Sequence, residues 1–177
     1  MSAMTGPLEV VCCRPSDTRS VAAAVAPFLQ PGDVVLLDGD LGAGKTTFTQ
    51  GLARALGVRE GVTSPTFTLV RSYATAAGFD LLHVDVYRLD RLSEVVDLAL
   101  PEYLEDGAVA VIEWGRKAAA ALPGDHLQID IDLTDNDADR RLTFASVGST
   151  WAARFEPMGT AIEAALTAEQ SSWGVQA

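Results

Sequence analysis

One eight-residue segment constrains the fold more than any other part of the chain. Residues 39–46 read GDLGAGKT and match the pattern G-x-x-x-x-G-K-[ST] at every position. The apolar run VVLL comes just before them. In the segment Thr46–Leu56 that follows, Phe48, Leu52 and Leu56 recur at helical spacing. A strand, a glycine-rich turn and a helix in this order are the context in which the pattern binds phosphate, so the sequence predicts a phosphate-binding loop (P-loop) in an α/β fold.

The residue types of this loop explain its chemistry. Glycines let the backbone curl until successive N–H groups converge on phosphate oxygens. Lys45 supplies a point charge for the β- and γ-phosphates, the Thr46 hydroxyl can ligate Mg²⁺, and the helix adds its positive N-terminal end. The predicted nucleotide contacts are Gly39, Asp40, Leu41, Gly42, Ala43, Gly44, Lys45, Thr46 and Thr47.

The identity of the nucleotide is inferred from motifs that the sequence lacks. Ras-like GTPases read guanine with N-K-x-D, and the chain has neither this motif nor D-x-x-G. Asn136 lies in TDND, which has no lysine. ATP with Mg²⁺ is therefore the expected nucleotide.

Composition and charge exclude several classes of protein. With 48% hydrophobic and 21% charged residues, the chain has the composition of a folded globular protein. The 13 Lys and Arg against 24 Asp and Glu give a formal charge of −11, so direct nucleic-acid binding by the chain alone is not expected. The apolar stretches are too short for a membrane span, and the first ten residues do not read as a secretory signal. A cytoplasmic protein without membrane contact is expected.

The remaining pattern predicts a mixed sheet flanked by helices, with antiparallel hairpins, in a single domain over residues 1–177. Apolar runs predict strands at Leu8–Cys13, Asp33–Leu37 and Ala108–Ile112 and two hairpins, Phe67–Tyr73 with Phe79–Leu89 and Leu127–Leu133 with Arg141–Val147. A helix is predicted from Pro15 to before Pro31, one or two short helical turns over Ser93–Leu104 with an interruption at Pro101, and a helix over Gly148–Ala168. The chain from about residue 155 is expected to be an extension, frayed from Glu169 onward.

Two carboxylates stand at predicted strand ends. His83, Asp85 and Tyr87 would share one face of their strand, while Val84 and Val86 enter the core. A carboxylate in so apolar a run needs a partner, and Mg²⁺ with its waters suits Asp85, although an exposed strand edge would also accommodate it. Glu113 follows VAVI at the carboxyl end of a parallel strand, where open α/β sheets place their ligands. We expect Glu113 to hold a magnesium-bound water or to orient the attacking one. His83 could be catalytic or structural, and Arg88 could touch phosphate, a partner or an acidic neighbour.

Four motifs in order give the chain a specific resemblance. They are LGAGKT, then Ser64-Pro65-Thr66-Phe67, then His83 to Arg88 (HVDVYR), and then Ile112-Glu113-Trp114. Over about residues 8–150 the chain resembles the bacterial TsaE (YjeE) family, small P-loop ATPases of tRNA N6-threonylcarbamoyladenosine (t6A) biosynthesis.

The resemblance implies roles for particular residues and partners. It implies that Thr66 senses the γ-phosphate or Mg²⁺ in a switch-like loop, and that Glu113 and Trp114 belong to the active site. The catalytic residues would be Lys45, Thr66, Asp85 and Glu113, with Thr46, Asp85 and Glu113 at the metal. It also implies that TsaD and TsaB are partners, which modify adenosine 37 of tRNA, so that this chain meets tRNA through the complex.

Two other functions remain open at this point. P-loop kinases of small molecules are often of this size, but they usually close an arginine-rich helical lid over the phosphates, and no such segment is evident. The chain could also be an assembly or regulatory module in which ATP binding, and not hydrolysis, matters.

Overall fold

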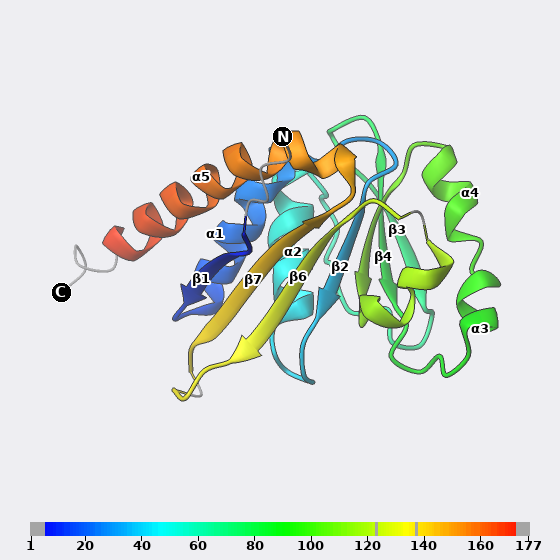
Figure 1. Ribbon diagram of the computed structural model, residues 1–177, viewed down its shortest axis with the longest axis horizontal. Helices are drawn as coiled ribbons and strands as arrows, with labels where there is room; N and C mark the ends of the chain where they lie inside the picture. Colours follow the sequence, from blue (N-terminus) through cyan, green and yellow to red (C-terminus); the bar gives the residue numbers. More distant parts are fainter. Residues whose placement is uncertain (1–5, 123, 137, 173–177) are drawn as a thin grey trace.

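The computed structural model describes residues 6–122, 124–136 and 138–172. Within them, seven strands form one sheet in the order β1-β7-β6-β2-β5-β4-β3 (Figure 1). The strands are β1 (Leu8–Cys12), β2 (Val34–Asp38), β3 (Val70–Ala74), β4 (Asp80–Asp85), β5 (Val109–Glu113), β6 (His126–Leu133) and β7 (Arg140–Val147). This is the mixed sheet that the sequence predicts.

The centre of the sheet is parallel and its edges are antiparallel. Strand β2 pairs in parallel with β5 and β6, and β5 pairs in parallel with β4. The two predicted hairpins, β3–β4 and β6–β7, are both present, and β1 adds to β7. A parallel centre requires cover on both faces, which explains why VVLL and VAVI are apolar throughout.

Helices cover the two faces of the sheet (Figure 1). One face carries α1 (Pro15–Val25), which continues as the 3-10 turn η1 (Ala26–Phe28), together with α2 (Lys45–Ala55) and α5 (Ser149–Ser172). The other face carries α3 (Leu92–Val96), α4 (Leu100–Glu105) and the 3-10 turns η2 (Gly115–Lys117) and η3 (Ala119–Ala121). No helix in the described part of the chain is both long and apolar enough to cross a bilayer.

Each face has its own apolar core, as the period-two alternation of strands requires. Leu37 and Val111 face α2, and Leu36 and Ile112, their neighbours in sequence, face the opposite side. Val84 is fully buried, as predicted. The sheet is thus packed from both sides, and only its strand ends are free to build a polar site.

The first hairpin is shorter than predicted on both sides. The segment Thr66–Thr68 is a turn, closed by a hydrogen bond from Leu69 N to Pro65 O (2.7 Å), so β3 begins only at Val70. Strand β4 ends at Asp85, and the chain turns at Tyr87 and Arg88. The prediction that Tyr87 continues the strand is therefore wrong. The aromatic residues of these turns, Phe67 and Tyr87, lie at the surface and not in the core.

Two helix boundaries also differ from the prediction. Pro101 does not interrupt a helix but sits in the first turn of α4, where its missing N–H is not needed. Helix α5 continues to Ser172, and Ser20 donates a hydrogen bond to Glu169 Oε2 (2.8 Å), so Glu169–Ser172 are not frayed. Buried side chains of α5 such as Phe155 and Ile162 pack onto the sheet, which explains its length. Residues 173–177 lie outside the described residues.

Candidate functional site

The candidate site lies where three parallel strands end side by side. Glu113, the last residue of β5, is in register with Leu37 of β2 and with Asp85 of β4. The P-loop leaves β2 one residue after Leu37 and leads directly into α2. Two carboxylates and the phosphate-binding loop therefore meet at the carboxyl edge of the sheet, as expected for an open α/β fold.

Glycines allow the loop to adopt its path at two positions. Gly39 has φ +138°, and a Cβ atom there would lie 2.2 Å from the carbonyl oxygen of Ile131. Gly44 has φ +114° and immediately precedes Lys45, the first residue of α2. Larger residues would be strained at both points, so the turn and the close approach of the loop to β6 depend on glycine.

Lys45 is buried within the loop that it serves. Its side chain is only 5% exposed, and Nζ donates hydrogen bonds to the carbonyl oxygens of Gly39 (2.6 Å) and Asp40 (2.9 Å). The Trp114 ring lies against the ammonium group, with its centroid 3.9 Å from Nζ. Burial lowers the pKa of Lys45, while the carboxylates of Glu113 and Asp85 act in the opposite direction. The ammonium group is therefore held in place at the loop.

Glu113 connects the P-loop to strand β4. Thr46 donates its hydroxyl hydrogen to Glu113 Oε1 (2.8 Å), and His83 Nε2 approaches the same oxygen at 2.8 Å. His83 is fully buried; with a proton on Nε2 it donates to Glu113, while its Nδ1 has no hydrogen-bond partner among the described residues. His83 contacts the carboxylate of Glu113 and does not line the cavity itself, and both its catalytic and its structural role stay predictions.

Asp85 connects strand β4 to the loop that resembles a switch. Ser64 Oγ donates to Asp85 Oδ2 (3.1 Å) and shares a hydrogen bond with Thr66 Oγ1 (2.8 Å). The backbone N–H of Tyr87 donates to Asp85 Oδ1 (2.9 Å). Asp85 is 5% exposed, so the alternative of an exposed strand edge does not hold. Ser64 therefore links this loop directly to the Asp85 carboxylate.

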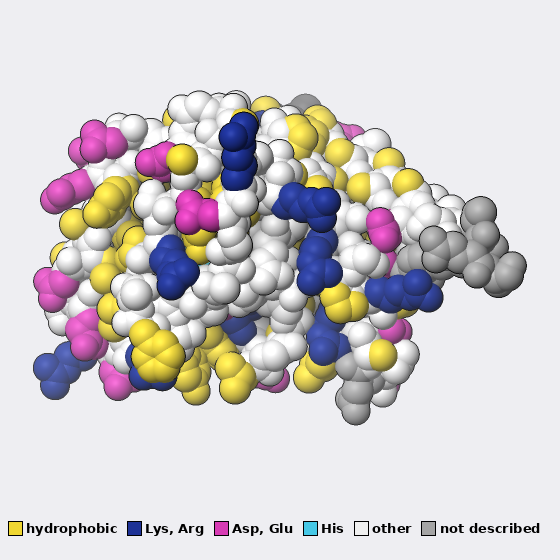
Figure 2. Space-filling model, turned by 180° about the vertical axis from the view of Figure 1, so that it is seen from behind, with side chains coloured by type: hydrophobic (Ala, Val, Ile, Leu, Met, Phe, Trp, Pro, Cys, Tyr) yellow, Lys and Arg dark blue, Asp and Glu magenta, His cyan; other side chains and the backbone are white. Residues whose placement is uncertain are grey.

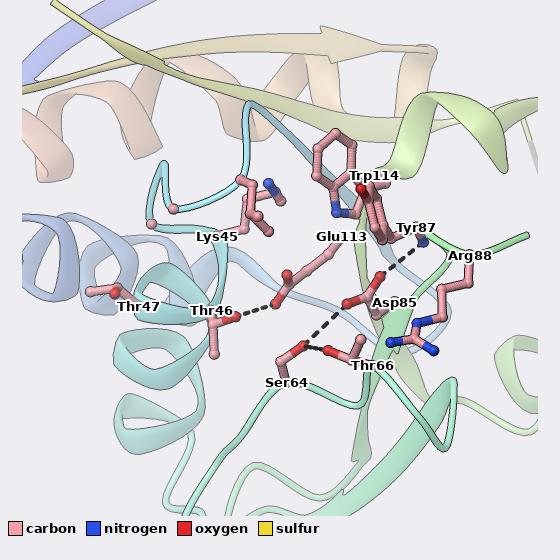
Figure 3. Close-up of a pocket in the computed structure, with 13 residues that line it drawn as sticks. Lys45, Thr46, Thr47, Ser64, Thr66, Asp85, Tyr87, Arg88, Glu113 and Trp114 are labelled. Carbon is pink, nitrogen blue, oxygen red and sulfur yellow. Dashed lines mark hydrogen bonds between the residues drawn. The ribbon is translucent and has the colours of Figure 1, made fainter.

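These groups line an open cavity of about 500 Å³ (Figure 3). Ten of the predicted site residues surround it: Leu41, Gly42, Gly44, Lys45, Thr46, Thr47, Thr66, Asp85, Glu113 and Trp114. Three predicted contacts do not line it: Gly39, Asp40 and Ala43. Gly39 and Asp40 instead hold Lys45 through their carbonyl groups, and Ala43 is buried. The predicted site residues thus surround one cavity, apart from three residues of the P-loop that do not line it.

Three further residues, Ser64, Tyr87 and Arg88, line the cavity and were not in the predicted site. Tyr87 packs on Trp114, with ring centroids 4.9 Å apart. Trp114 has φ +62°, an uncommon backbone conformation for a bulky residue and one that is often found at functional sites. Ser64 and Arg88 belong to motifs that the sequence already singles out. Their role in the cavity depends on turns that periodicity does not predict.

The oxygen groups around the cavity fit a magnesium ion that is shared with phosphate. Thr46 Oγ1, Glu113 and Asp85 offer the hard oxygen ligands that Mg²⁺ prefers. Within the described residues, no cluster of three or more His, Cys, Asp or Glu forms a closed metal cage. Mg²⁺ at nucleotide sites typically uses one or two carboxylates plus substrate phosphates, so these residues suit it.

The negative net charge is unevenly distributed over the surface. Figure 2 shows Lys and Arg side chains spread over the face that α1 and α2 cover, while Asp and Glu side chains gather toward the end that carries α3 and α4. Between residues 90 and 106, six residues are acidic and only Arg91 is basic. The acidic character is thus strongest at one end of the molecule.

Fold and site together define a P-loop NTPase-like α/β protein. The sequence model described as "Threonylcarbamoyl adenosine biosynthesis protein TsaE" matches residues 12–142, more than half of the chain. The chain belongs to the TsaE family.

Individual relatives agree with this assignment. A protein of Bacillus subtilis named "tRNA threonylcarbamoyladenosine biosynthesis protein TsaE" is 44% identical over 137 residues, covering 77% of this chain and 84% of the relative. A Streptomyces coelicolor protein of the same name is 45% identical over 139 residues, covering 76% and 93%. The crystal structure of Bacillus subtilis YdiB matches with a TM-score of 0.71 at 36% identity, covering 92% of this chain and 97% of that one.

Proposed function

We propose that this protein binds and hydrolyses ATP in the biosynthesis of t6A at position 37 of tRNA. The observation that carries the proposal is the meeting of Lys45 and Thr46 with Glu113 and Asp85 at one cavity, in a chain of the TsaE family. The substrate is ATP, the metal is Mg²⁺ and the compartment is the cytoplasm. Hydrolysis drives conformational cycling of a TsaD–TsaB transferase complex, which contacts the tRNA.

The phosphates are bound by the P-loop. Its backbone N–H groups and the N-terminus of α2 surround the β- and γ-phosphates, and Lys45 neutralises their charge. For this, Lys45 exchanges its carbonyl partners Gly39 and Asp40 for phosphate oxygens. Thr46, Asp85 and Glu113 would hold Mg²⁺, which stabilises negative charge on the β- and γ-oxygens when bound.

Glu113 orients the attacking water in the chemical step. The water oxygen forms a bond to the γ-phosphorus while the bond from that phosphorus to the β–γ bridging oxygen breaks. The electron pair of the broken bond remains on ADP, and one water proton passes to Glu113 and then to solvent. His83 fixes the carboxylate, since its Nε2 contacts Glu113 Oε1 at 2.8 Å.

The loop Ser64–Phe67 reports the state of the nucleotide. Thr66 lines the cavity and is linked through Ser64 to Asp85. With ATP bound, Thr66 turns toward the γ-phosphate and its metal, and hydrolysis releases it. Ordering and release of such a segment is a common way to change the surface that a partner sees.

The proposal is tested by hydrolysis and partner binding measured together. ATP turnover by the purified chain should be slow and should rise when TsaD and TsaB are added. Capture of the two partners should differ between ATP and ADP. Stoichiometric phosphate transfer to a small metabolite instead of water would favour a kinase. A variant that binds ATP without hydrolysing it, yet supports full modification, would favour a binding-only module.

A further inference from the structure

Positive charge around the cavity comes from two side chains. Among the described residues that line it, Lys45 and Arg88 are the cations, and Asp85 and Glu113 are the anions. Lys45 stands at the P-loop, where it meets the β- and γ-phosphates. Arg88 lies across the cavity, on the side of Asp85 and Thr66 (Figure 3). A second cation on this side would face the γ-phosphate from the direction opposite Lys45.

The other nearby cations have different positions. Lys117 Nζ donates to the carbonyl oxygen of Tyr87 (3.0 Å) and does not line the cavity. Arg116 pairs with Asp130. Arg14 and Arg140 line a separate, smaller cavity on the far side of the P-loop. Arg88 is therefore the residue placed to supply the second charge.

The backbone at Arg88 is fixed relative to the two carboxylates. Val86 N donates to Glu113 O (3.3 Å), and Leu89 N donates to Val86 O (3.1 Å) to close the turn. Tyr87 N is bonded to Asp85 Oδ1 (2.9 Å). Val86 and Leu89 are buried in the core beneath the turn. The Arg88 side chain thus extends from a turn that is hydrogen-bonded both to the Glu113 backbone and to the Asp85 carboxylate.

The guanidinium group of Arg88 rests on a residue of the switch-like loop. Its Cζ lies 4.6 Å from the centroid of the Phe67 ring. Phe67 is 85% exposed and follows Thr66 directly. A cation–aromatic contact at so exposed a site is weak. A competing triphosphate can therefore displace the arginine from the ring.

We propose that Arg88 is a catalytic residue that contacts the transferring γ-phosphoryl group, and that Phe67 holds its guanidinium group at the edge of the cavity, away from the phosphate, until Thr66 moves. This inference rests on the proposed function. As water attacks and the bond to the bridging oxygen breaks, negative charge is spread over the γ-oxygens and develops on ADP. The guanidinium group stabilises that charge, with no bond made or broken at Arg88 itself.

The test compares ground-state binding with transition-state binding in the isolated full-length chain. ADP affinity, affinity for ADP with aluminium fluoride and the ATP turnover rate are measured for wild type, Arg88→Ala and Arg88→Lys. Arg59→Ala, an exposed arginine away from the cavity, is the control. Arg88→Ala should keep ADP affinity within about threefold and lose 10²-fold or more in turnover, since an arginine in this role contributes ~10³–10⁵. It should also lose the gain in affinity that aluminium fluoride gives, and Arg88→Lys should restore part of both.

The role of Phe67 is tested by a double variant. Phe67→Leu removes the ring, so its turnover in the isolated chain should rise several-fold, and the rise should vanish in Phe67→Leu/Arg88→Ala. No rise in Phe67→Leu would overturn the holding role.

Two further results would overturn the catalytic role. The first is an Arg88→Ala variant that keeps the wild-type turnover rate and the wild-type affinity for ADP with aluminium fluoride. The second is an Arg88→Ala variant that loses affinity for ADP alone and for ADP with aluminium fluoride by the same factor. A wild-type chain that binds no ATP would instead overturn the proposed function, and the inference with it.

Discussion

The hydroxyl of Thr46 donates a hydrogen bond to Glu113 Oε1 over 2.8 Å, across 67 residues of sequence. This contact joins the last residue of the P-loop to the last residue of β5. Thr46 is a predicted metal ligand, and Glu113 is the predicted water-positioning group. Binding of Mg²⁺ would replace this direct hydrogen bond. The two residues that stabilise the site without nucleotide are therefore also placed to bind the metal and to position the water.

Replacement of Lys45 by alanine should abolish nucleotide binding or weaken it by orders of magnitude. The triphosphate loses its principal protein cation, while the fold persists because the side chain faces the loop and cavity. Isothermal titration calorimetry with ATP measures the affinity, and Arg59→Ala is the matched surface control. Unchanged ATP affinity in Lys45→Ala would contradict the P-loop assignment.

Asp85→Ala and Glu113→Ala should separate hydrolysis from binding. Each removes a carboxylate assigned to Mg²⁺ or water and leaves the phosphate-binding loop intact, so turnover should fall by ~10²-fold or more and affinity by much less. Turnover is measured as the steady-state ATPase rate with TsaD and TsaB present, and binding is measured as the ADP affinity. Normal hydrolysis by both variants would show that the roles are assigned wrongly.

The start of α5 should make a contribution to stability that disappears in acid. Thr150 N donates to Asp125 Oδ2 (2.9 Å), and this backbone hydrogen bond lowers the pKa of Asp125 from 3.8. Because the folded-state pKa lies below the unfolded value, the stabilisation is present above about pH 4 and is lost as pH falls through the lowered value. The Tm difference between wild type and Asp125→Ala should shrink below pH 4, whereas the difference between Asp125→Asn and Asp125→Ala, neither of which carries a titrating group at this position, should not change with pH. An Asp125→Ala difference that does not change between pH 7 and pH 3 would contradict this.

Arg154 should stabilise the protein without affecting the nucleotide site. Its guanidinium group donates to Asp33 Oδ2 (2.6 Å), Asp33 Oδ1 (2.9 Å) and Phe28 O (2.7 Å), and the Asp33 side chain is only 9% exposed. Arg154→Met leaves this carboxylate without its partner and should lower the free energy of unfolding by about 3 kcal/mol. Urea unfolding measures the loss, and ADP affinity should be unchanged because Asp33 precedes β2 whereas the P-loop follows it. A loss of ADP affinity equal to that of Lys45→Ala would show that α5 and the site are coupled.

The sequence predicted the parts of the site that lie on regular elements. The P-loop, Asp85 and Glu113 follow apolar runs whose ends meet at one edge of a parallel sheet, so their proximity follows from the topology. What the pattern could not predict were the turns. Phe67 and Tyr87 look like strand residues because they are aromatic. A hydrogen bond at Leu69 closes the turn that contains Phe67, and a hydrogen bond to Asp85 holds Tyr87 in the turn after β4, so neither aromatic residue enters the core.

Side-chain contacts between distant residues were also beyond the pattern. His83 is fully buried on the same strand face as Asp85, but its contact with Glu113 depends on the β4–β5 register.

The length of α5 likewise follows from the face of the sheet that this helix covers. The stripe expected around Ile162 marks its inner face, while the ion pair between Arg154 and Asp33 and the contact of Ser20 with Glu169 extend its anchoring at both ends.

The central claim is that ATP use by this chain supports t6A formation, and the most direct measurement is the t6A content of bulk tRNA by nucleoside mass spectrometry. It is made in cells depleted of the protein and supplied with wild type, Lys45→Ala or Arg59→Ala. Depletion should lower t6A, wild type and Arg59→Ala should restore it, and Lys45→Ala should not. Normal t6A after depletion, or full restoration by Lys45→Ala, would contradict the account.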